Sequence, residues 1–221
     1  MYAPFLSISL ICQIAGSDTT ANTLTYLLHE LSRPQNQFIQ KRLHEEVLSL
    51  KRSSNTPSLS LSELDKLPFL DAVIREGLRV FSAIPFLEPR QVPTGGRIIN
   101  SYFLPEYTTV GIQAYTLHHD DSVYPEPDTY NPDRWLTSDD EHLKRMHRSF
   151  WAFGSGQRGC IAEHLAWLEM KLAVAEIYVV FRTEVAPGFE DREMVVDDQI
   201  SSIVPIGRRC MLVFKKWNDS D

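Results

Sequence analysis

The clearest chemical potential in this sequence lies in residues 153–162, which read FGSGQRGCIA. Glycines in this segment allow the backbone to fold tightly beside a flat ligand. Cys160 follows them and precedes a predicted helix, whose exposed N–H groups and dipole favour a thiolate, the form that binds iron. Arg158 could pair with an anionic group on the same ligand. The segment therefore predicts a ligand-binding thiolate, the alternative being a buried and inert thiol.

A second unusual pattern lies in the apolar N-terminal stretch, where residues 15–20 read AGSDTT. An acid followed by a hydroxyl inside an apolar helix is costly to bury without partners. Gly16 weakens the helix and leaves room beside it. Asp18 and Thr19 are therefore candidates for a functional pair, the alternative being a helix kink with Asp18 in a local salt bridge.

A third pattern is the pair Glu76 and Arg79, which lie three residues apart on one face of a predicted helix. Ion pairs of this spacing are common on protein surfaces, so the pair carries little meaning by itself.

The composition is that of an ordinary globular protein. The chain has 221 residues, enough for one substantial core or two small ones, with 43% hydrophobic and 23% charged residues. The net charge of -7, without a run of lysine or arginine, argues against a nucleic-acid partner. Cys12, Cys160 and Cys210 form no CxxC pair, which indicates a reducing compartment rather than a disulfide framework.

Helical periodicity dominates the first third of the chain. Leucines at 24, 27, 28 and 31 predict a long helix over residues 4–31. Its apolar start has no basic flank and is too short to span a bilayer, so we expect the first turns of a buried helix there. Further helices are expected over 34–80, with Pro34 in a first turn, a capping box from Ser60 to Glu63, and Pro68 opening a helix to about Val80.

The rest of the chain alternates between short elements and loops. Residues 84–117 predict a small sheet, with strands such as 97–99 and 108–114. Residues 118–153 show little periodicity and are expected to be a long functional loop leading to the cysteine segment at 160. A helix over 160–180 and two or three strands over 181–217 follow. The expected fold class is mainly α with a small β-sheet region (α+β).

Taken together, these motifs resemble the cytochrome P450 family of haem-thiolate monooxygenases. The family pattern FxxGxRxCxG is matched at Phe153, Gly156, Arg158 and Cys160, with Ala162 in place of the usual glycine. The resemblance implies haem (iron protoporphyrin IX) with Cys160 as its axial ligand. It implies further haem contacts from Arg90, Phe153, Gly154 and Arg158.

The resemblance also gives roles to the two other patterns. Asp18 and Thr19 resemble the acid–alcohol pair that delivers protons to iron-bound dioxygen. Residues 132–135 read PDRW and resemble a segment whose arginine, here Arg134, joins Glu76 and Arg79 in a buried structural network under the haem.

Residues 85–90 resemble the segment that passes over the haem, where Arg90 would meet a propionate. Candidate substrate contacts are Ala15, Ile84, Phe86, Leu87 and Ile203, with Ile200 a weaker one. His118 and His119 are expected to be structural. The family's Pro-x-Gly turn is replaced by Pro105-Glu106-Tyr107, which implies a different turn or strain, because a type II turn favours glycine at its third position.

The resemblance runs from about residue 4 to 217 and covers only the C-terminal half of a family member, beginning at the central long helix. It implies oxidation of a small apolar organic substrate with electrons from NADPH through a cytochrome P450 reductase. The PDRW segment and the loop resemble fungal members, many of them in secondary metabolism. The implied location is intracellular, on the cytoplasmic face of the endoplasmic reticulum, with membrane association only through an N-terminal anchor that is not expected in this chain. The alternatives are a truncated, inactive family fragment and a soluble interaction domain without haem.

Overall fold

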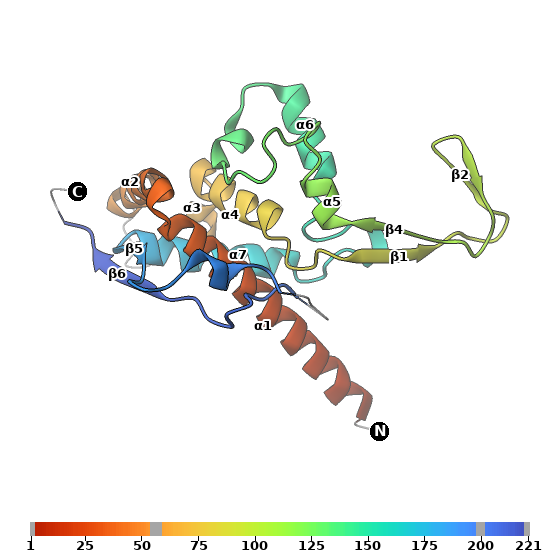
Figure 1. Cartoon of the computed structure of the whole chain (residues 1–221), viewed down its shortest axis with the longest axis horizontal. Helices are drawn as coiled ribbons and strands as arrows, with labels where there is room; N and C mark the ends of the chain where they lie inside the picture. Colours follow the sequence, from red (N-terminus) through yellow and green to blue (C-terminus); the bar gives the residue numbers. More distant parts are fainter. Residues whose placement is uncertain (1–2, 54–58, 198–201, 219–221) are drawn as a thin grey trace.

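The computed structural model describes residues 3–53, 59–197 and 202–218. Its core is built from four helices (Figure 1): α1 (Ala3–Ser32), α2 (Gln37–Ser53), α4 (Pro68–Val80) and α7 (Glu163–Tyr178). Leu27, Leu43, Val73 and Val174 meet in one cluster that takes residues from all four. Burying each of these side chains stabilises the fold by about 1.5–3 kcal/mol.

The helices begin where the local sequence requires it. Pro34 opens a short 3-10 turn, Pro34–Asn36, ahead of α2, and Pro68 is the first residue of α4. Ser60 and Glu63 form the expected capping box before α3 (Leu61–Leu64), with Ser60 N–H donating to Glu63 Oε2 at 2.9 Å. These starts agree with the sequence expectations.

In Figure 1 the N-terminal part of α1 extends away from the other elements. The expected burial of the first turns falls on side chains before Ala15 that lie outside the description, while Ala15, Ser17 and Asp18 are exposed. In α2 the buried side chains include Ile39, Leu43 and Val47, whereas Phe38 is exposed.

The strands form three antiparallel pairs among the described residues: β1 (Leu87–Gln91) with β4 (Thr109–Gln113), β2 (Arg97–Ile99) with β3 (Tyr102–Leu104), and β5 (Phe181–Val185) with β6 (Leu212–Lys216). Residues 84–117 thus form two ribbons rather than the expected single sheet (Figure 1). β1 escaped sequence analysis because Pro89 lies at its centre, opposite Gly111. A two-stranded ribbon tolerates this proline because its N–H side can face away from the partner.

The stretch 118–153 was expected to be a loop, and this was wrong in part. It holds a 3-10 turn, Pro132–Leu136, and the helix α6 (Asp140–Ser149), while α5 (Ala114–His118) precedes it. α6 shows no apolar periodicity because it buries a single residue, Met146. Asp139 caps it by accepting from the N–H groups of Glu141 and His142, and an acidic first turn and basic last turn suit the helix dipole.

The Pro105-Glu106-Tyr107 turn shows the anticipated strain. Tyr107 has a φ of 65°, and Thr108 N–H donates to Pro105 O at 3.3 Å across the turn. The tyrosine therefore occupies the left-handed position where glycine is favoured, at a cost of about 1–2 kcal/mol.

The described helices also bear on membrane insertion. Within these residues, no helix combines the length and the apolar character needed to cross a bilayer.

The fold class is confirmed as mainly helical with small antiparallel sheets.

One buried amide ties the C-terminal end of α1 to β5. Gln40 Nε2 donates to Leu31 O at 2.6 Å and to Thr183 O at 2.8 Å, while Gln40 Oε1 accepts from Thr183 N–H at 2.8 Å. Because Gln40 is fully buried, no water can replace these bonds.

We expect Gln40→Ala to lower the free energy of unfolding by about 3 kcal/mol, because it leaves the buried Thr183 N–H and the Leu31 carbonyl without partners. Gln37→Ala is the matched control, since Gln37 bonds Ser32 O and Thr183 O from a half-buried position at 3.2 Å. Its loss should stay below about 1 kcal/mol. Urea denaturation of both variants measures the difference, and equal losses would contradict this account.

Candidate active site

The cysteine loop is a closed hairpin at the N-terminal side of α7. Cys160 N–H donates to Phe153 O at 2.8 Å, and Gly159 N–H donates to Gly156 O at 3.1 Å. Gly154 and Gly156 have φ values of 67° and 65°, which side chains rarely adopt. The thiol of Cys160 is exposed. The loop thus exposes one sulfur atom, and its backbone conformation depends on two positive φ angles that glycine adopts without strain.

Phe153 holds this loop to the core. Its ring packs against the main hydrophobic cluster and lies 6.2 Å from the ring of Trp167 on α7. In contrast, Ile161, the residue after Cys160, is 99% exposed, and Leu165 in the first turn of α7 is 54% exposed. Large apolar side chains this open commonly mark a surface that a ligand or another part of a protein covers.

β1 lies beside the cysteine loop. A Cβ atom built on Gly154 would lie 3.4 Å from Glu88 Oε2, and Arg90 donates to the same oxygen at 3.3 Å. Arg90 is therefore near the loop, and it has an acidic partner, Glu88, that sequence analysis missed. Arg158, the other candidate for an anionic group, is exposed.

Glu76 is the centre of a buried hydrogen-bond network. Its Oε1 accepts from Arg79 Nη2 at 2.9 Å, Arg134 Nε at 2.9 Å and Asn131 N–H at 3.0 Å. Its Oε2 accepts from Arg79 Nε and Trp135 Nε1, both at 2.9 Å. Glu76 and Arg79 are fully buried. The structure therefore brings together the three residues that sequence analysis placed in one network.

The two arginines extend the network to the backbone around it. Arg79 Nη1 donates to His118 O at 2.7 Å, and Arg134 Nη1 donates to Pro125 O at 3.0 Å. Both arginines also donate to Thr129 O at 3.3 Å. These bonds hold the chain between α5 and α6 against α4.

His118 connects this network to the cysteine loop. Its Nε2 accepts from Trp151 N–H at 2.8 Å, so Nδ1 carries the proton, 3.1 Å from Arg79 O and 2.7 Å from Ser82 Oγ. Burial, with the charge of Arg79, lowers the pKa of His118 to about 3. The ring is therefore neutral near pH 7, which keeps Nε2 available as an acceptor.

The acid–alcohol pair lies on α1. Thr19 Oγ1 donates to Ala15 O at 2.8 Å, one turn earlier in the same helix, and Asp18 is exposed. Such a bond to the preceding turn often bends a helix slightly.

The substrate candidates divide into two groups. Ala15, Ile84, Phe86 and Leu87 are exposed, whereas Ile203 is 2% exposed and packs with Tyr26 and Met194. The burial of Ile203 leaves its predicted substrate contact without support. Ile203 N–H instead donates to Ala83 O, in the segment before β1, at 3.0 Å. The neighbouring Ser202 Oγ accepts from Asn22 Nδ2 on α1 at 3.0 Å. Residues 202 and 203 thus connect α1 to the segment before β1. Ile200 lies outside the described residues.

Comparisons with known proteins agree with this arrangement. The family model for cytochrome P450 matches residues 8–206. The chain belongs to the cytochrome P450 family. It is 36% identical over 205 residues to cytochrome P450 monooxygenase cypX of Dothistroma septosporum, which covers 91% of this chain and 39% of that protein. Cytochrome P450 monooxygenase stcB of Emericella nidulans is 36% identical over 201 residues, covering 90% of this chain and 37% of that protein.

The fold is also that of part of a cytochrome P450. The retinoic acid-bound cyanobacterial CYP120A1 superposes with a TM-score of 0.78 at 23% identity, covering 94% of this chain and 45% of that chain. The expectation of a partial P450 fold is therefore confirmed. The chain spans about two fifths of the length of the curated relatives it matches.

The family implies haem, and the residues present fit it. Within the described ranges, no group of three His, Cys, Asp or Glu side chains could hold a metal ion. One exposed cysteine sulfur suits an iron that arrives already held by a macrocycle. The glycine hairpin and the open side chains of Ile161 and Leu165 offer a close backbone approach and an apolar contact for a flat ring.

The Glu76 network can be tested by an isosteric substitution. Glu76→Gln removes the negative charge that Arg79 needs, and we expect a loss of about 3–5 kcal/mol in the free energy of unfolding because the arginine stays buried. Glu141→Gln is the matched control, since Glu141 pairs with Lys144 at the same i, i+3 spacing but on the surface. Chemical denaturation should show less than about 1 kcal/mol for the control. Similar losses in both would refute a special role for Glu76.

His118 predicts a distinct pH dependence of stability. In the folded chain the pKa of His118 is about 3, below its usual value of 6.5. At a pH between these two values, His118 is protonated in the unfolded chain but neutral in the folded chain. His118 should therefore remove about 1.4 kcal/mol of stability for each unit that the pH falls below about 6.5. In unfolding curves at several pH values, His118→Gln should show a shallower loss than the unsubstituted chain. An unchanged slope would mean that His118 does not titrate as inferred.

Proposed function

We propose that the chain is a single partial haem-binding domain, residues 1–221, of a haem-thiolate monooxygenase. The reaction is oxidation of a small apolar organic molecule by dioxygen, with electrons from NADPH delivered through a cytochrome P450 reductase. The observation that carries this proposal is the cysteine loop, which presents an exposed thiol and is tied through Trp151 and His118 to the buried Glu76 network. Relatives named cytochrome P450 monooxygenases support it.

Cys160 supplies the protein's ligand to iron. The exposed Cys160 side chain lies two residues before the N-cap of α7, Ala162, and its deprotonated form, a thiolate, is the form that binds haem iron. Haem bound through such a thiolate supplies the activation of dioxygen that oxidation of an apolar molecule needs. Phe153 and Gly154 shape the loop, while Arg90 and Arg158 offer positive charge to the carboxylates of the cofactor.

Asp18 and Thr19 are the proposed route for protons. Asp18 is exposed, so its carboxylate can exchange a proton with water. Thr19 Oγ1 keeps its proton directed at Ala15 O until an acceptor approaches, and proton transfer from Asp18 then restores it. Substrate would lie against Ala15 on α1 and against Ile84, Phe86 and Leu87 before and at the start of β1.

The biological setting is proposed from the relatives. Several of the relatives come from fungi, including Dothistroma septosporum and Emericella nidulans. They support the proposal that this protein acts in the secondary metabolism of a fungus. We place the protein inside the cell, on the cytoplasmic face of the endoplasmic reticulum, where a membrane-bound reductase would meet it.

A second candidate is an inactive fragment of the same family. It is favoured by the exposed apolar side chains of Ile161 and Leu165. Without a cover, water at this site would weaken control over oxygen chemistry.

The carbon monoxide difference spectrum of the reduced chain, expressed with a haem precursor, separates the two candidates. We expect a strongly red-shifted Soret band that Cys160→Ser lacks and that Cys210→Ser keeps, because Cys210 is the other cysteine whose side chain the structure describes. Far-UV circular dichroism should show that all three chains are equally folded. A folded chain without haem uptake, or a band that survives Cys160→Ser, would refute the proposal.

A further inference from the structure

Glu88 and Arg90 lie on the side of β1 that faces the cysteine loop. Alternate residues of a strand point to the same side, and in β1 positions 88 and 90 are half-buried while 87, 89 and 91 are exposed. Glu88 Oε2 and Oε1 lie 3.4 and 3.7 Å from a Cβ atom built on Gly154. The carboxylate of Glu88 therefore borders the loop that carries Cys160, yet the proposed function gives this acid no role.

Glu88 already occupies a positive charge that is proposed for the cofactor. Its Oε2 accepts from Arg90 Nη2 at 3.3 Å, while Arg90 Nη1 donates to Pro89 O at 3.0 Å. The Arg90 side chain is 39% exposed and that of Glu88 is 22% exposed. A pair this open adds little stability because water screens both charges, so a stronger partner can replace Glu88 at the guanidinium.

A carboxylate of haem is such a partner. Guanidinium groups bind carboxylates most strongly through two parallel hydrogen bonds of about 2.7–2.9 Å. The contact from Arg90 to Glu88 is a single hydrogen bond of 3.3 Å, which is longer and therefore weaker. Two carboxylates that share one guanidinium also repel each other. Arg90 therefore favours one of these two carboxylates at a time.

We infer that Glu88 is a resident competitor of haem at Arg90. In the chain without haem, Glu88 pairs with Arg90 beside Gly154. When haem binds, its carboxylate replaces Glu88 at the guanidinium. This competition, which rests on the proposed haem site, adds a residue that weakens haem binding. Glu88 thus sets how readily the chain takes up and releases its cofactor.

Titration of the full chain with hemin, followed through the Soret band, tests the competition. We expect Glu88→Gln to bind hemin about threefold more tightly than the unsubstituted chain, because the competing charge is gone while Arg90 remains. Hemin dimethyl ester, which lacks the carboxylate charges, is the second probe. The two chains should bind the ester with equal affinity, because an ester offers Arg90 no negative charge.

Glu184→Gln is the matched control. Glu184 pairs with Arg182 at 3.9 Å, with the same spacing of two residues along a strand, and it also pairs with Lys215. Its strand, β5, follows the C-terminal end of α7, which lies about 24 Å from the N-terminal end of that 16-residue helix. Because this distance exceeds the screening length of physiological salt, Glu184→Gln should leave the hemin affinity unchanged.

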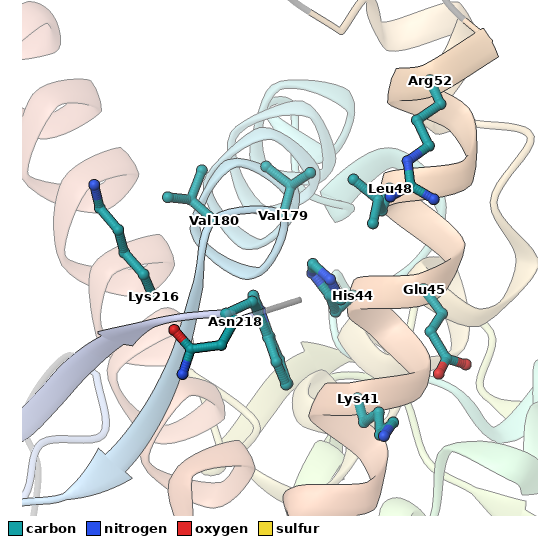
Figure 2. Close-up of a pocket in the computed structure, with 10 residues that line it drawn as sticks. Lys41, His44, Glu45, Leu48, Arg52, Val179, Val180, Lys216 and Asn218 are labelled. Atoms are coloured by element: carbon teal, nitrogen blue, oxygen red, sulfur yellow. The ribbon is translucent and has the colours of Figure 1, made fainter. Parts of the chain in front are cut away.

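Hemin bound at another place must be separated from hemin at the cysteine loop. A groove of about 630 Å³ lies between α2 and the ends of α7 and β6, and Figure 2 shows His44 among its lining residues. His44 Nδ1 donates to Tyr178 O at 2.9 Å, so Nε2 is the nitrogen that could bind iron. Affinities are therefore taken from the strongly red-shifted band of the reduced carbon monoxide complex, which Cys160→Ser lacks.

The possible outcomes separate this inference from the proposed function. Equal hemin affinities of Glu88→Gln and the unsubstituted chain, with the red-shifted band intact, would overturn the competition and leave the haem site standing. A gain that is equally large with the dimethyl ester, or with Glu184→Gln, would also overturn it. Absence of the red-shifted band from every chain would overturn the haem site and the competition together. Circular dichroism spectra that superpose ensure that differences in affinity are not differences in folding.

Discussion

The buried carboxylate of Glu76 is the interaction on which the rest of the site depends. Five donors from four residues converge on its two oxygens, and two of those residues are arginines. A charge of this kind is stable inside a protein only when its partners are complete, because removal of any one leaves another unpaired. The network therefore fixes α4 and the turn Pro132–Leu136 as one unit.

That unit is joined to the cysteine loop by two kinds of contact. His118 accepts from Trp151 N–H, just before Phe153, and its low pKa keeps the acceptor nitrogen unprotonated. Arg75, one residue before Glu76, lies 5.0–5.6 Å from the ring centroids of Trp135, Phe150 and Trp167. A cation among aromatic rings adds stability at little geometric cost, and here it links α4 to α7. The position of the thiol is thus set from both the hairpin and the helix that follows it.

The sequence allowed the motifs and the long helices to be predicted, but not the contacts between them. Leucine spacing and Pro68 indicated α1 and α4, because both signals are local. Pro89 concealed β1, and the polar face of α6 concealed that helix, because each depends on a partner or a cap rather than on periodicity. Glu76, Arg79 and Arg134 were found through resemblance, whereas Glu88 beside Gly154 and Ile203 in the core depend on tertiary packing that no local pattern encodes.

The Gln40–Thr183 pair has a consequence for the order of folding. These residues are 143 positions apart, and the same cluster draws its members from Leu27 to Val179. A chain that emerges from the ribosome at about 5–20 residues per second must therefore wait on the order of ten seconds between the synthesis of α2 and that of its partner strand. During that interval α1, α2 and α4 lack α7 and β5, which complete the cover of their apolar faces. Contacts this distant in sequence slow folding, so the nascent chain is a natural client for chaperones that shield helices until β5 arrives.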